Sequence, residues 1–82
     1  MAYITYSQFQ SLNTGVEITE SEFNTLYFYT EAAIDGYFGR HIDPPPDNVT
    51  RAAGMQIALA KMNGGIGYYS ASANSTRLNS ED

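Results

Sequence analysis

The sequence predicts a small all-α domain, and three observations support this fold class. Two segments begin with the same helix-capping signal, and a third segment, residues 48–63, is apolar with helical spacing. No alternation of apolar and polar residues, the pattern of a strand, extends beyond four residues. The chain has 82 residues, 43% of them hydrophobic, and we expect a three-helix domain over residues 1–67 with a flexible C-terminal tail over residues 68–82.

The first helix is predicted over residues 6–12. Thr5 stands three residues before Gln8, the spacing of a capping box in which each side chain bonds the backbone amide of the other residue. Ile4 and Phe9 have the spacing of a hydrophobic staple across the same helix start. The Asn-Thr-Gly segment that follows favours a turn, so the helix is short.

The second helix is predicted over residues 20–38, because the same capping signal recurs at Thr19 and Glu22 and Gly39 can provide a left-handed stop. Its apolar stripe lies within an arc of about 140°. The stripe consists of Phe23, Leu26, Tyr27, Thr30, Ala33, Ile34, Tyr37 and Phe38. We expect this stripe to face the core and Glu31 and Asp35 to form a solvated flank.

The third helix is predicted over residues 48–63, after an extended connection that the three consecutive prolines of residues 44–46 impose. Asp47 is the expected N-cap. Apolar residues cover most of the circumference of this helix and leave a narrow polar strip, formed by Thr50, Arg51, Gly54 and Lys61. A helix that is apolar nearly all round needs cover on most sides, which so small a chain cannot supply, so we expect association with other subunits.

Charge and composition exclude several classes of function. Nine acidic and four scattered basic residues leave a net charge of −5, which is unsuited to binding a phosphate backbone or an acidic membrane surface. The chain has no cysteine and one histidine, so neither a disulfide nor a structural zinc site is expected. No segment is long and apolar enough for a membrane span and no signal-peptide pattern is present, so we expect a protein made in the cytosol.

The sequence offers no candidate for catalysis and no cofactor motif. His41 lies in the proline loop, where we expect an exposed histidine without a chemical role. The glycines of residues 64–67 follow a helix and lack a subsequent Lys-Ser/Thr, so they predict helix termination rather than a phosphate loop. We therefore expect that the protein is not an enzyme.

The candidate functional residues are instead aromatic and suited to contacts with other proteins. Tyr and Phe are enriched at interface cores, because a large rigid ring gains contact area at small entropic cost. The expected subunit or partner contacts are Phe28, Tyr29, Gln56, Tyr68, Tyr69, Arg77 and Leu78. For Phe28 and Tyr29 the alternative is packing on a neighbouring helix, and for Gln56 it is a hydrogen bond to nearby backbone.

Several of these segments resemble one protein family. They are Tyr3 to Phe9, the helix start from Ile18 to Phe23, and the run from Ala52 to Ile57 that leads to Gly64-Gly65. Over about residues 3–67 the chain is similar to the head–tail connector proteins of long-tailed bacteriophages, which are also called adaptor or head-completion proteins.

This resemblance implies a small helical subunit in a ring, of 12 copies by family analogy, that lies beneath the portal and extends the DNA channel toward a stopper or tail-completion protein. It implies a location in the neck of the virion after synthesis in the host bacterial cytoplasm, with DNA passing without specific binding. Family members dock on the portal through a segment after the third helix, and here residues 70–82 stand in that place. Two alternatives remain: another small helical interaction module, and a DNA-binding regulator, which the absence of basic residues from the second helix disfavours.

Overall fold

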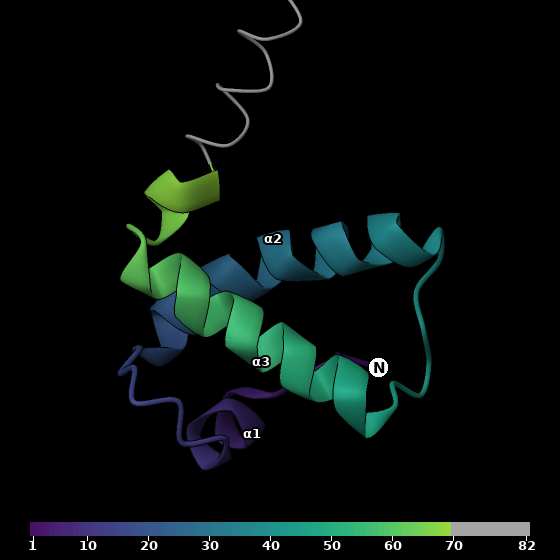
Figure 1. Cartoon of the computed structure of the whole chain (residues 1–82), viewed down its shortest axis with the longest axis horizontal. Coiled ribbons are helices and arrows are strands. Elements are labelled where there is room, and N and C mark those ends of the chain that lie inside the picture. Colours follow the sequence, from purple (N-terminus) through teal and green to yellow (C-terminus); the bar gives the residue numbers. More distant parts are fainter. Residues whose placement is uncertain (70–82) are drawn as a thin grey trace, which may run out of the picture.

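The structure is a computed structural model that describes residues 1–69, and all regular secondary structure in that range is helical (Figure 1). Helix α1 spans Tyr6–Ser11, α2 spans Glu20–Phe38 and α3 spans Asp47–Met62. One further helical turn covers residues 66–69. The all-α class is therefore confirmed for the described part of the chain.

Both predicted capping boxes are formed. The Thr5 hydroxyl accepts the amide of Gln8 at 3.1 Å, and the Gln8 side chain accepts the amide of Thr5 at 2.9 Å. At the start of α2, the corresponding distances between Thr19 and Glu22 are 3.2 and 3.1 Å. Each pair satisfies two backbone amides that have no partner within the helix. Local sequence therefore determines where these two helices begin.

The helix ends differ slightly from the prediction. α1 stops one residue early, with Leu12 as its C-cap, whereas α2 ends as predicted at Gly39, whose φ is 76°. α3 begins at Asp47, so this residue is not the N-cap; Pro46 holds the cap position, and its carbonyl accepts the amide of Thr50 at 3.1 Å. Asp47 instead places a negative charge in the first turn, where the helix dipole favours it.

The glycines after α3 terminate the helix, as predicted, but a helical turn follows. Gly64 and Gly65 have positive φ angles of 112° and 64°, and the Gly65 amide bonds the Ala60 carbonyl at 2.7 Å. This six-residue closure is typical of a glycine-terminated helix. Tyr68 and Tyr69 therefore lie on the turn of residues 66–69 rather than in a loop at the start of a tail. The rest of the predicted tail, residues 70–82, lies outside the described residues.

The core is formed where α2 packs against α3, with α1 against the start of α2. Toward the end of α2 the two long helices diverge, and the N-terminal segment runs in the space between them (Figure 1). Tyr3 and Ile4 on this segment are each only 1% exposed, so they act as part of the core. The buried apolar residues are Tyr3, Ile4, Phe9, Ile18, Phe23, Leu26, Val49, Ala53, Ile57, Ala58 and Ala60.

The apolar stripe of α2 faces the core along only part of the helix. Phe23, Leu26 and Thr30 are buried, as expected. Tyr37, by contrast, is 83% exposed, and Phe38 is also exposed. The divergence of α3 from the end of α2 explains the difference, because no other helix within residues 1–69 lies over Tyr37 and Phe38 (Figure 1).

Candidate functional site

Four of the expected contact residues form one aromatic cluster that joins α2 to the turn of residues 66–69. The Phe28 and Tyr29 rings meet edge-on with centroids 5.4 Å apart. Tyr29 stacks on Tyr69 at 5.3 Å and 19°, and Tyr69 meets Tyr68 edge-on at 5.2 Å. These separations are typical of favourable aromatic pairs. We call Phe28, Tyr29, Tyr68 and Tyr69 the aromatic cluster.

The aromatic cluster is connected to the core at one end and open to solvent at the other. Thr30 is fully buried, and its hydroxyl forms a hydrogen bond of 2.7 Å with the Tyr69 hydroxyl. This bond satisfies a buried polar group and holds the turn of residues 66–69 against α2. Phe28 is 67% exposed and Tyr29 is 41% exposed. Tyr29 is thus partly covered by the chain itself, whereas Phe28 offers most of its ring to a partner.

The remaining expected contact residues do not join this cluster. Gln56 is half-buried on α3, and its side-chain amide forms no hydrogen bond within residues 1–69. Arg77 and Leu78 lie outside the described residues.

α3 carries a second exposed apolar surface, which we call the α3 stripe and define as Ala52, Met55, Leu59 and Met62. Met55 is 56% exposed, Leu59 is 44% exposed and Met62 is 69% exposed. The spacing of three, four and three residues places all four side chains along one side of the helix. The sequence indicated an apolar helix but no such separate surface.

The opposite side of α3 contains most of the strip that the sequence marked as polar. Gly54 is buried on this side with the small residues Ala53 and Ala58, and Thr50 and Lys61 are half-buried. A Cβ atom at Gly54 would lie 2.2 Å from Leu12 Cδ1, so the close approach of α1 depends on this glycine. The helix therefore turns its small residues inward together with Val49 and Ile57, and leaves Met55, Leu59 and Met62 outside.

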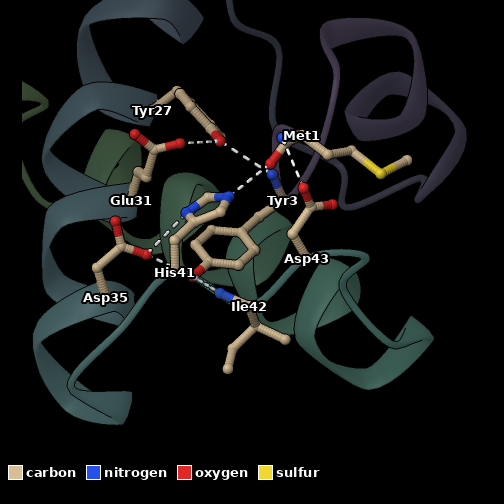
Figure 2. Close-up of polar contacts among 8 residues, drawn as sticks. All are labelled: Met1, Tyr3, Tyr27, Glu31, Asp35, His41, Ile42 and Asp43. Carbon is tan, nitrogen blue, oxygen red and sulfur yellow. Dashed lines mark hydrogen bonds and ion pairs between the residues drawn. The ribbon is translucent and has the colours of Figure 1, made fainter.

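A polar network, which we call the N-terminal clamp, fixes the first residues of the chain to α2 (Figure 2). The Tyr27 hydroxyl accepts the amide of Tyr3 at 2.9 Å and donates to Glu31 at 2.6 Å. The Tyr3 hydroxyl donates to Asp35 and accepts the amide of Ile42 at 3.0 Å. Glu31 and Asp35 are therefore not the solvated flank that the sequence predicted.

His41 completes the N-terminal clamp and is not the free loop histidine that was expected. Its Nδ1 lies 3.0 Å from Asp35, its Nε2 lies 2.6 Å from the Met1 carbonyl, and its ring packs on that of Tyr3 with centroids 4.5 Å apart. A carbonyl oxygen can only accept a hydrogen bond, and so can an ionised carboxylate. Both ring nitrogens therefore donate, which makes His41 an imidazolium in this arrangement.

The charges of the clamp stabilise one another. The Met1 carbonyl and then the Asp35 carboxylate raise the pKa of His41 above its ordinary value of 6.5, although partial burial opposes this shift. Hydrogen bonds from Tyr3 and then His41 lower the pKa of Asp35 below 3.8. Burial and the Glu31 acceptor raise the pKa of the Tyr27 hydroxyl. At neutral pH Asp35 is thus ionised, and both tyrosines are neutral donors.

One signal in the sequence could have indicated this network. Tyr27, Glu31 and Asp35 follow one another at intervals of four residues, so their side chains line one side of the second helix. Nothing local indicates that residues 1–3 and residue 41 meet there, because that encounter depends on the path of the loop around the end of α2.

The clamp has the chemistry of a structural contact. In a catalytic dyad the Nε2 atom of His41 would face a nucleophile, but here it forms a hydrogen bond with the Met1 carbonyl. Among residues 1–69, no group of three or more His, Cys, Asp or Glu side chains is placed to hold a metal ion. Within the same residues, no helix has the length and apolar character needed to cross a membrane.

Comparisons with protein-family models, with curated proteins and with solved structures found no significant match for this chain. A function for this chain is therefore inferred from its residues and from the resemblance of its sequence to a known family.

Proposed function

We propose that this chain is a structural subunit that assembles with its own copies into a ring, as the head–tail connector of a long-tailed phage. The ring, of 12 subunits by analogy, lies beneath the portal in the neck of the virion and continues the DNA channel toward the stopper or tail-completion protein. The chain has no catalytic role in this proposal.

The observation that carries the proposal is the pair of uncovered apolar surfaces on two different helices. The aromatic cluster and the α3 stripe expose Phe28, Met55 and Met62 by more than half. Exposed apolar patches of this kind mark contact sites on small proteins. A subunit with two different exposed apolar surfaces can bind one neighbour on each side, and a ring requires this arrangement.

The charge of the chain fits a channel through which DNA passes. Its net charge of −5 gives no attraction to phosphates, so DNA could slide along such a wall without adhering. α2 itself carries four acidic residues and no basic residue. This composition also argues against the alternative of a DNA-binding regulator that reads the major groove with α2.

The test is assembly in the presence of the portal of the same phage. The purified chain alone and the chain mixed with portal rings would be compared by native mass spectrometry and electron microscopy of negatively stained particles. We expect a complex in which the chain adds a ring of the same rotational order as the portal. Failure to bind the portal, with other partners captured instead, would favour the alternative of a different helical interaction module.

A further inference from the structure

The α3 stripe is an uncovered surface whose geometry suits a helix as its partner. Its steps alternate between three and four residues, as at the apolar positions of a coiled-coil heptad, so the stripe stays on one side of the helix. Such a stripe is the seam along which two helices pack at a small crossing angle. Met55, Leu59 and Met62 would be the side chains that insert between those of the partner helix.

The chain supplies one matching surface, the outer side of α2 at Phe28 and Tyr29. The two sides differ in side-chain chemistry, since one presents thioethers and a leucine and the other presents aromatic rings. Methionine sulfur packs favourably against aromatic rings, and its flexible side chain adapts to their outline. Each surface is therefore better suited to the other than to a second copy of itself.

Charge favours the same pairing. α2 carries four acidic residues and no basic residue. α3 has Arg51 exposed next to the stripe, four residues before Met55. Two α2 helices side by side would bring acidic residues together, whereas two α3 helices offer Arg51 only Asp47 of the first turn as an opposite charge. An α3 stripe against α2 of another copy brings Arg51 toward a helix that carries acidic residues and no basic residue.

We propose that the α3 stripe of one subunit docks on the aromatic cluster of the next, in a head-to-tail contact between copies of this chain. The segment of residues 70–82 is a poorer occupant of either surface, because its one large apolar residue is Leu78. A head-to-tail contact leaves one free surface at each end of a pair, so it propagates into a ring or a filament. Closure of this contact into a ring rests on the proposed function, whereas the contact itself is independent of that function.

Disulfide capture tests this contact, since the natural chain contains no cysteine. Full-length chains with Leu59→Cys and with Phe28→Cys are oxidised separately and as an equal mixture, after circular dichroism has shown that both remain folded. We expect several-fold more mixed disulfide dimer than either same-residue dimer. An equal mixture of Leu59→Cys with Tyr37→Cys is the control, because Tyr37 is exposed on α2 outside the aromatic cluster, and it should show no excess of mixed dimer.

A blocking experiment provides the second readout. Leu59→Glu removes the α3 surface and Phe28→Glu removes the α2 surface, so neither variant should self-associate beyond a monomer in sedimentation velocity. Mixed together, they retain one intact pair of surfaces and should form a one-to-one dimer that grows no further. Self-association of either variant alone would overturn the proposal, since it would show pairing of like surfaces.

The remaining outcomes separate the contact from the ring. Mixed disulfides without rings on the portal would leave the contact intact and count against the proposed function. Rings on the portal without mixed disulfides would overturn the contact and leave the proposed function standing. Mixed disulfides that form only after deletion of residues 70–82 would also overturn the contact in the natural chain, because that segment would then be the occupant.

Discussion

At the scale of single residues, two glycines within helices have opposite structural roles. Gly54 lies where α3 meets Leu12 and Ile4, and a Cβ atom there would approach their side chains to 2.2 and 2.9 Å. Gly36 lies within α2 where a Cβ atom would meet nothing within 4 Å. The first glycine is thus required by packing within the subunit, and the second is not.

Substitution of each glycine by alanine should therefore change stability in opposite directions. Gly36→Ala should raise the free energy of unfolding by up to about 1 kcal/mol, because alanine is the better helix former. Gly54→Ala should lower it by about 1 kcal/mol, because overpacking of roughly 1–3 kcal/mol outweighs the same helix gain. Urea unfolding of both variants measures the difference, and a stabilised Gly54→Ala variant would show that Leu12 moves aside without cost.

His41 should make the N-terminal clamp sensitive to pH. Its neighbours are Asp35 and Glu31 from α2, Tyr3 and the Met1 carbonyl from the N-terminal segment, and the nearby Asp43 of its own loop. Folding raises the pKa of His41, so its contribution to stability is complete below 6.5 and disappears as pH rises through the raised value. Folding lowers the pKa of Asp35, whose contribution is present above 3.8 and is lost as pH falls through the lowered value.

The clamp should therefore stabilise the fold most between these limits. We expect the difference in unfolding free energy between the natural chain and His41→Gln to be largest near about pH 5.5 and to shrink toward about pH 9. Urea unfolding across this range measures it. Because the chain has one histidine, NMR titration of its ring reports the pKa directly, and a value at or below 6.5 would contradict the arrangement.

At the scale of helices, the start of α2 is coupled to the end of α3. The Glu22 carboxylate that completes the capping box also bonds the Lys61 ammonium. The Lys61 contact first, and the Thr19 amide next, lower the pKa of Glu22. One side chain therefore joins a local helix signal to a contact between helices that are distant in sequence.

Removal of the cap should weaken the whole domain. Thr19→Ala should lower the free energy of unfolding by about 0.5–2 kcal/mol, the usual effect of losing an N-cap side chain. Thr25→Ala is the matched control: this exposed threonine lies inside the same helix, where alanine has the higher helix propensity, so no loss is expected. Thermal or urea unfolding compares them, and equal loss from both would argue against a specific role for the cap.

At the scale of the whole molecule, Phe28 and Tyr29 are the exposed end of the aromatic cluster, whereas Tyr69 is bonded to the buried Thr30. Phe28 is not part of the buried core, and Tyr29 stacks on Tyr69 at its edge. The combined variant Phe28→Ala with Tyr29→Ala should therefore keep its helical content and fold as a monomer, but fail to form rings on the portal.

Circular dichroism and native mass spectrometry provide the two readouts of this prediction. Tyr37→Ala is the control, because it removes an even more exposed aromatic ring from another part of α2 and should leave assembly unchanged. Unfolding of the double variant would instead mean that the aromatic cluster belongs to the core.

By itself, the sequence determined the helical class, the two capping boxes, the bounds of α2 and the stop after α3. These features depend on residues within one or two turns of each other, so local hydrogen bonding and backbone preference are sufficient. The tertiary structure decided which side of α3 faces inward, because close helix packing buried its small residues with Val49 and Ile57 and left Met55 and Met62 outside. It also brought His41 to Asp35 and Met1, since that contact depends on where the chain turns after α2 and not on any local pattern.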